Sequence, residues 1–113
     1  MNPKWKPIKR TETQILSAIC DYLQIKGYYY WRQNSTGIYD TKRKCFRSTP
    51  KGFKKGIADI FVLSGHYTVA LEIKSETGKM SPYQKDFEHH WLKSDFRYYH
   101  IVRSVDDVIE LGL

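Results

Sequence analysis

The sequence has little cysteine and no long apolar run. Among its 113 residues the only cysteines are Cys20 and Cys45, and no Cys-x-x-Cys pair or Cys/His ligand spacing is present. A disulfide-stapled secreted module and a zinc module are therefore excluded, and a reducing compartment is favoured. No apolar run approaches the ~20 residues needed to span a bilayer. We therefore expect a cytoplasmic protein without membrane association.

Internal repeats and low-complexity tracts are also absent. Hydrophobic residues make up 41% of the chain, aromatic residues 15% and charged residues 27%, which is typical of a folded protein rather than a disordered one. The length suffices for one compact domain with a single core and is too short for two. We therefore expect a single domain over residues 1–113.

Positive charge is concentrated in two segments. The formal net charge is +7, yet a basic N-terminal tail (1–10) carries four cations and a basic loop (34–56) carries seven cations against Asp40 alone. The rest of the chain is mildly acidic, so the asymmetry points to a polyanion, most commonly nucleic acid. Aromatic residues between the cations could stack on bases; a merely solubilising loop remains the alternative. The candidate nucleic-acid-binding residues of the loop are Lys42, Arg43, Lys44, Arg47, Lys51, Lys54 and Lys55.

Helix caps and apolar periodicity predict an α/β element order. Thr11 and Gln14 can form a capping box for a first helix that stops at Gly27, and Ser81 and Gln84 can form another for a second helix with Pro82 at its first position. On that second helix we expect residues 83, 87 and 91, all aromatic, to contact the core. Runs rich in β-branched and aromatic residues predict strands over 28–32, 57–63, 67–74 and 97–103, with a terminal helix from 105 to about 111. The order is α-β-β-β-α-β-α.

A predicted hairpin brings two carboxylates together. Gly65-His66 fits a two-residue type II′ turn, which pairs Ser64 with Tyr67. Counting back along both strands places Asp59 opposite Glu72, with Cβ atoms about 4.5–5.5 Å apart. Strand alternation leaves one face of 67–74 apolar and ends the other face with Glu72 and Lys74.

Two carboxylates at this separation repel each other, and a bound divalent cation would neutralise that repulsion. Oxygen ligands from Asp59 and Glu72 with added water suit Mg²⁺ or Mn²⁺. Lys74, on the same face, could orient an attacking water or stabilise charge on phosphorus. The alternatives are an ion pair of Lys74 with either carboxylate at a sheet edge, or a hairpin with a different register.

Several runs resemble a known nuclease family. Two of them, Gly56-Ile57-Ala58-Asp59 and Leu71-Glu72-Ile73-Lys74, look like the PD-(D/E)XK nuclease signature. Residues 77–84 (TGKMSPYQ) and 102–108 (VRSVDDV) are similar to its virus-type replication-repair (VRR-NUC) branch, and the element order also matches. There are two departures: Ala58 stands where Pro is expected, and Ser104 stands where the second Arg of Val-Arg-Arg is expected.

The resemblance implies a fold and a chemistry. The fold would be a restriction-endonuclease-like αβββαβ core, with a mixed central sheet flanked by helices. The activity would be metal-dependent hydrolysis of DNA phosphodiester bonds with Mg²⁺ or Mn²⁺ as cofactor. The metal ligands would be Asp59, Glu72 and the Ile73 carbonyl, and the other catalytic residues would be Lys74, Glu12 and Gln84. Apart from the family, Glu12 is a favourable charge in a first helical turn and Gln84 a capping-box member.

The resemblance also implies a substrate and an assembly. The chain is similar to stand-alone members of this branch, and this implies a homodimeric endonuclease. It would cut four-way (Holliday) junctions in DNA repair, in a bacterial or phage-infected cell. A nuclease for flaps or other branched DNA is an alternative within the same class. A non-catalytic DNA-binding protein that keeps the nuclease fold is an alternative from another class.

Overall fold

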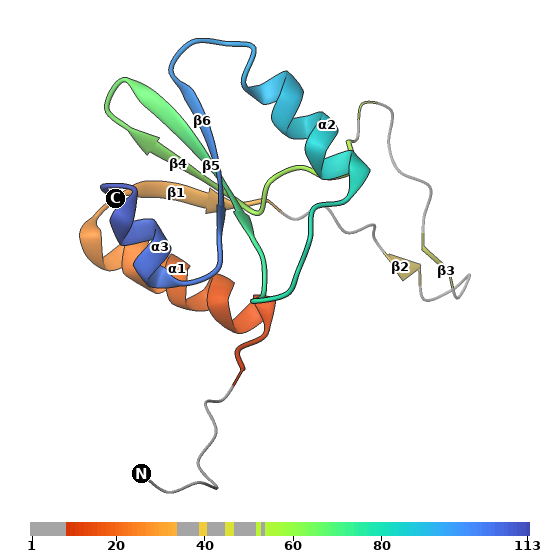
Figure 1. The fold of residues 1–113 in the computed structure, drawn as a ribbon, viewed down its shortest axis with the longest axis horizontal. Helices are drawn as coiled ribbons and strands as arrows, with labels where there is room; N and C mark the ends of the chain where they lie inside the picture. Colours follow the sequence, from red (N-terminus) through yellow and green to blue (C-terminus); the bar gives the residue numbers. More distant parts are fainter. Residues whose placement is uncertain (1–8, 34–38, 41–44, 47–51, 53) are drawn as a thin grey trace, which may run out of the picture.

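The computed structural model describes residues 9–33, 39–40, 45–46, 52 and 54–113 (Figure 1). In chain order, the described elements are α1 (Glu12–Lys26), β1 (Tyr29–Arg32), β2 (Tyr39–Asp40), β3 (Cys45–Phe46), β4 (Ile60–Ser64), β5 (Tyr67–Ile73), α2 (Pro82–Trp91), β6 (Arg97–Val102) and α3 (Val105–Glu110). All the helices and strands expected from the sequence are present. Within this described part, no helix combines the length and the apolarity needed to cross a membrane.

Four strands form a mixed sheet in the order β1-β4-β5-β6. β4 pairs antiparallel with both β1 and β5, whereas β5 and β6 are parallel. A parallel pair needs a crossover, and α2 supplies it. The predicted fold class, an α/β core with a mixed central sheet flanked by helices, is confirmed.

The segment 34–56 departs from the prediction of a plain loop. Its described residues include β2 and β3, which pair antiparallel as a separate two-stranded sheet. Each strand has two residues, too few for a period-2 pattern to appear in the sequence. The rest of this segment up to residue 51, and residue 53, lie outside the described residues.

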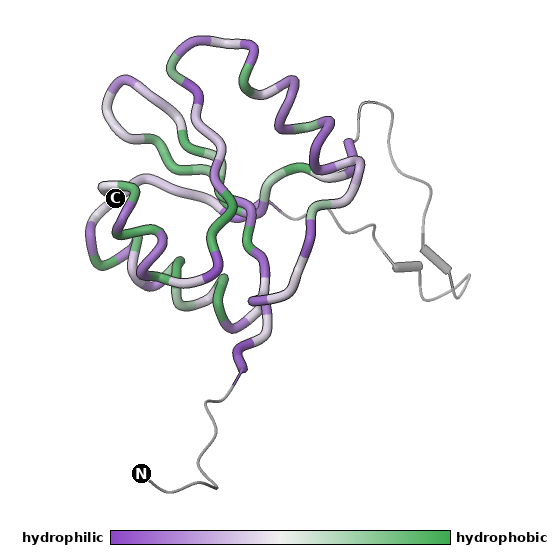
Figure 2. The backbone as a smooth tube through the Cα atoms, viewed as in Figure 1, coloured by the Kyte–Doolittle hydropathy of each residue, from purple (hydrophilic) through white to green (hydrophobic). Residues whose placement is uncertain are grey.

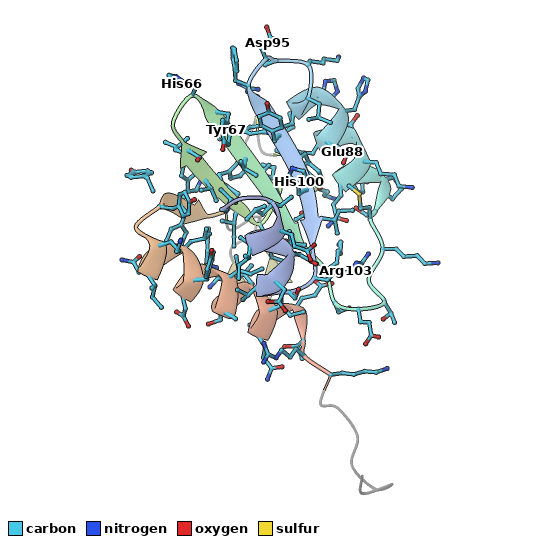
Figure 3. The ribbon with its side chains drawn as sticks, turned by 60° about the vertical axis from the view of Figure 1, so that its left-hand side comes forward. His66, Tyr67, Glu88, Asp95, His100 and Arg103 are labelled. Carbon is cyan, nitrogen blue, oxygen red and sulfur yellow. The ribbon has the colours of Figure 1, made fainter. Side chains whose placement is uncertain are left out.

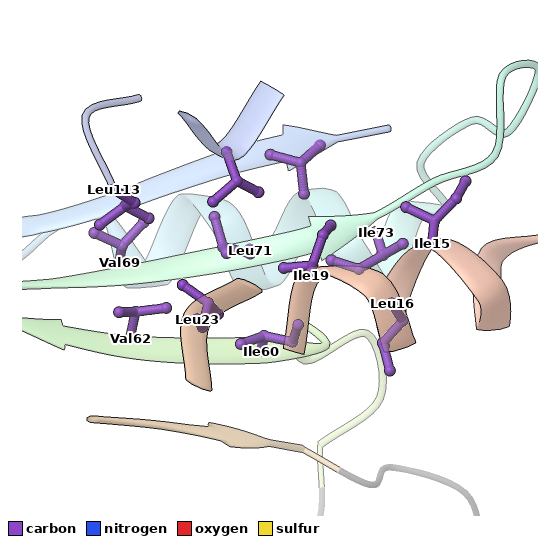
Figure 4. Close-up of a cluster of buried hydrophobic side chains, with 12 residues drawn as sticks. Ile15, Leu16, Ile19, Leu23, Ile60, Val62, Val69, Leu71, Ile73 and Leu113 are labelled. Carbon is purple, nitrogen blue, oxygen red and sulfur yellow. The ribbon is translucent and has the colours of Figure 1, made fainter. Parts of the chain in front are cut away.

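Helices cover both faces of the sheet. α1 and α3 lie on one face, where α1 contributes Ile15, Leu16, Ile19 and Leu23 to a core completed by apolar side chains of β4 and β5 (Figure 4). α2 lies on the other face, above a smaller cluster that includes Phe61, Ala70 and Tyr99. Figure 2 shows mostly hydrophobic residues along β4 and β5 and mostly hydrophilic ones along α2. β5 is therefore buried on both sides, including its polar end.

The predicted helix boundaries and hairpin are confirmed. Both capping boxes form, and Gly27 closes α1 with a left-handed φ of 80°. Gly65 has a φ of 59°, as the first position of a type II′ turn requires, and Ser64 pairs with Tyr67. β4 begins three residues later than the predicted strand start at residue 57.

One predicted core contact is wrong. Phe87 and Trp91 pack against the α2-side cluster, but Tyr83 is 58% exposed. The first turn of α2 lies against the backbone of Gly56 rather than over the sheet, which leaves the Tyr83 ring outside. The Lys55 ammonium lies 5.4 Å from the centre of that ring.

Candidate active site

Asp59 and Glu72 are brought together where β4 begins and β5 ends. The register that pairs Ile60 with Leu71 places Asp59 opposite Glu72, as the hairpin predicted. The Asp59 N–H donates to the Leu71 carbonyl at 3.1 Å, so the pairing extends one residue beyond β4. The Ile73 N–H donates to Asp59 Oδ2 at 2.8 Å and fixes the side chain at the end of β5.

Glu72 is a buried carboxylate. It is 2% exposed and lies on a central strand. Its Oε1 accepts a hydrogen bond from Gln84 Nε2 at 2.7 Å and lies 3.4 Å from Lys74 Nζ. Its Oε2 is buried and has no hydrogen-bond partner among the described residues. Burying a carboxylate oxygen without a partner is costly, so this oxygen is available to a ligand.

The electrostatics of the pair disfavour two free negative charges. Burial, followed by the charge of Asp59, raises the pKa of Glu72 to about 7, although Lys74 opposes the shift. Burial also raises the pKa of Asp59, while the Ile73 N–H and the charge of Lys74 act in the opposite direction. Lys74 alone therefore does not compensate both carboxylates, and an additional cation would.

The donor set fits a hard divalent cation. Asp59 and Glu72 offer carboxylate oxygens, one of them the unpartnered Glu72 Oε2, and the Ile73 carbonyl is the third ligand implied by the sequence resemblance. Among the described residues no group of three or more His, Cys, Asp or Glu side chains could hold a metal ion. Side-chain ligation here would therefore rest on two carboxylates, with the remaining positions left to carbonyl oxygen and water. Mg²⁺ usually keeps several waters and binds through one or two carboxylates.

Glu12 lies at the rim of this group rather than between the carboxylates. It is exposed in the first turn of α1, and its Oε1 accepts a long hydrogen bond, 3.4 Å, from the Ser75 N–H. A Cβ placed on Gly78 would lie 3.1 Å from Glu12 Oε1 and 3.3 Å from Lys74 Cδ. Glu12, Lys74 and Gly78 therefore meet where the β5–α2 connection leaves the sheet.

The Glu72–Lys74 ion pair, one of the alternatives to a metal site, is formed. It lies in the interior, since β5 runs between β4 and β6, and not at a sheet edge. The ammonium contacts Glu72 Oε1 and leaves Oε2 without a partner. The ion pair and a metal site are thus compatible.

Gln84 joins the cap of α2 to Glu72. Its Oε1 accepts from the Ser81 N–H at 2.8 Å, which turns Nε2 toward Glu72. Gly56 permits this arrangement, because a Cβ there would lie 2.4 Å from the Tyr83 carbonyl carbon. Sequence reasoning assigned no such packing role to Gly56; its place in the 56–59 run was the only signal.

Tyr99 was not among the predicted site residues. It is 8% exposed, and its hydroxyl is buried without a hydrogen-bond partner in the part of the chain that the structure describes. Burial and the negative charges of Glu72, Glu88 and Asp59 raise its pKa. Alternation along 97–103, combined with the β5–β6 register, puts Tyr99 on the face of Ala70 and Glu72. The register across a parallel pair could not be read from the sequence.

The candidate nucleic-acid-binding residues are only partly described. Lys54 and Lys55 are exposed and line a pocket with Phe87 on α2. The other five, Lys42, Arg43, Lys44, Arg47 and Lys51, lie outside the described residues.

Comparison with solved structures identifies the fold. The chain is similar to a solved structure titled "VRR_NUC domain protein", with a TM-score of 0.67 and 18% sequence identity over 93% of this chain and 87% of that one. No protein-family model matches the chain, and a search of curated proteins also finds no match. The fold is thus that of a VRR-NUC nuclease domain, as the sequence resemblance implied.

Proposed function

We propose that this protein is a metal-dependent endodeoxyribonuclease that hydrolyses phosphodiester bonds. One observation carries the proposal: Glu72, buried in a central strand opposite Asp59, keeps one carboxylate oxygen without a hydrogen-bond partner within residues 9–33, 39–40, 45–46, 52 and 54–113. A purely structural carboxylate would be expected to satisfy both oxygens, because an unsatisfied buried charge destabilises the fold. The nuclease fold of the chain supports the same conclusion.

Each proposed site residue has a distinct role. Asp59, Glu72 and the Ile73 carbonyl would hold Mg²⁺ or Mn²⁺, which when bound supplies a Lewis acid and an activated water. The Ile73 N–H orients Asp59, and Gln84 orients Glu72. Lys74, within reach of Glu72 Oε1, would position the attacking water and stabilise charge that develops on a phosphate oxygen. Glu12 holds the Ser75 backbone and thereby the chain next to Lys74.

The substrate we propose is branched DNA, with the four-way junction as first choice. The net charge of +7 and the basic loop (34–56) support binding to the DNA backbone. Two copies of the chain would provide two sites for the two strands of a junction, and a closed two-fold dimer is the commonest oligomer. Sedimentation analysis at micromolar concentration tests the oligomeric state, and a dimer supports the assembly. A monomer in sedimentation that, in a cleavage assay, cuts only one strand per encounter contradicts it.

Cleavage assays test the activity. Labelled linear duplex, flap and four-way junction DNA would be incubated with Mg²⁺, Mn²⁺ or EDTA, comparing wild type with Asp59→Asn and Lys74→Gln. Matched controls are Asp95→Asn and Lys93→Gln, which make the same changes at exposed positions between α2 and β6 (Figure 3). We expect metal-dependent cutting that falls by about 10²–10³-fold or more in both site variants and not in the controls.

The alternatives have distinct outcomes. Preference for flaps over junctions would redefine the substrate and keep the enzyme class. Wild-type protein that binds DNA but cuts none of these substrates with either metal would overturn the catalytic proposal. It would favour a DNA-binding protein that retains the nuclease fold.

A further inference from the structure

A second pocket lies beside the candidate active site and is lined by cations. It has a volume of about 360 Å³ and is formed where the start of α1, the connection after β5 and the start of α3 meet. Among the described residues that line it are the cations Lys9, Arg10 and Arg103 and one acid, Glu76. Figure 3 shows Arg103 at the end of β6, near the N-terminal end of α1. A concave surface with an excess of cations suits an anion.

The wall of this pocket is built by Arg103. Its Nη1 donates to the carbonyl oxygens of Ser75, Glu76 and Gly78, the last at 3.0 Å. These bonds tie the β5–α2 connection to the end of β6. Arg103 is thereby held in place by its Nη1, while Lys9 and Arg10, both exposed, add two further positive charges to the pocket.

The pocket shares a wall residue with the surroundings of the proposed catalytic group. Ser75 lines the pocket, follows Lys74 directly in the chain, and donates its N–H to Glu12. An anion in the pocket would therefore lie against Ser75, the residue that follows Lys74 in the chain. In DNA, phosphates recur about every 3.4 Å of rise along each strand, so a strand that presents one phosphate to Lys74 offers neighbouring phosphates to cations nearby.

We propose that this pocket binds a phosphodiester group of the DNA strand that flanks the bond to be cut. The inference rests on the proposed function, and it adds a substrate contact separate from the carboxylates and from the basic loop (34–56). Lys9 and Arg10 neutralise the phosphate, and the Arg103-anchored wall shapes the pocket. The contact adds binding free energy for the strand that carries the scissile bond.

A charge-matched pair of double variants tests the proposal. Lys9→Gln with Arg10→Gln removes two cations from the pocket, and Lys26→Gln with Lys93→Gln removes two exposed cations at the far ends of α1 and α2. Binding to labelled duplex DNA would be measured in EDTA over a range of salt concentrations. We expect the pocket variant to bind about tenfold more weakly than the control. The slope of log K against the logarithm of salt concentration should become shallower by the equivalent of one to two phosphate contacts, at about 0.9 per contact. In cleavage, KM would rise and kcat would stay unchanged.

The outcomes separate this proposal from the proposed function. Equal weakening by both double variants would overturn the pocket as a site, because diffuse electrostatics would then suffice. Wild type that binds DNA but never cuts, with the pocket variant selectively weakened, would overturn catalysis and support the pocket. Amide resonances of residues 75–77 that respond to inorganic phosphate but not to DNA would assign the pocket to free phosphate and overturn the DNA contact.

Discussion

Replacing Glu72 with glutamine is expected to make the metal-free protein more stable at alkaline pH. The folded state raises the pKa of Glu72 from 4.5 to about 7, mainly by burial. Because the folded state holds this proton more tightly than the unfolded state, the contribution of Glu72 to stability is full below pH 4.5 and is lost as the pH rises toward 7. A shift of this size corresponds to about 3 kcal/mol at pH 8. The glutamine variant keeps the Oε1 acceptor for Gln84 and carries no charge.

Urea unfolding in EDTA at pH 5, 6, 7 and 8 measures the effect. We expect the free energy of unfolding of wild type relative to Glu72→Gln to fall by up to about 3 kcal/mol between pH 5 and 8. Titrating groups that do not interact with Glu72 cancel in this difference, whereas Asp59, whose charge interacts with that of Glu72, contributes to it. Mg²⁺ or Mn²⁺ at pH 8 should then stabilise wild type by about 2.7 kcal/mol at a hundred times its Kd. The variant should respond much less.

Two results would refute this reasoning. Parallel pH profiles for wild type and Glu72→Gln would mean that the carboxylate is not held at a raised pKa. Equal stabilisation of both proteins by the metal would mean that the ion binds elsewhere. Asp95→Asn, in an exposed turn, is the control for general charge effects.

Three further substitutions test individual contacts. Gln84→Glu keeps the capping box but replaces the donor to Glu72 with a carboxylate. We therefore expect a near-complete loss of cleavage, while circular dichroism shows that α2 stays helical. Full cleavage activity would contradict the contact. Gly56→Ala would place a Cβ 2.4 Å from the Tyr83 carbonyl carbon, at a residue whose φ is 79°. Because of this clash and strain, the free energy of unfolding should fall by roughly 2 kcal/mol or more. An unchanged melting temperature would refute the close approach. Tyr99→Phe removes an unpartnered buried hydroxyl and should raise stability by ~1 kcal/mol in urea unfolding; a loss would reveal a partner.

The part of the site that could be predicted from the sequence is the part fixed by local geometry. Gly65 sets the turn, the turn sets the register, and the register places Asp59 opposite Glu72. The contacts that could not be predicted join segments without a short connection. Tyr99 reaches the face of Glu72 through a parallel pairing, and Gly56 meets α2 through a backbone approach, and neither leaves a periodic signal.

Gln84 shows why a structural and a functional interpretation of one residue need not compete. The capping box requires its side-chain oxygen to accept from the Ser81 N–H, and that requirement alone directs the amide nitrogen away from the helix end. The nitrogen then meets Glu72, which the hairpin register has placed beside the helix start. The cap therefore acts as the orienting device for a proposed metal ligand. Gln84, held at both ends in this way, positions Glu72 together with the Lys74 ammonium. A chain of 113 residues thus builds a buried polar group from elements that its fold already needs.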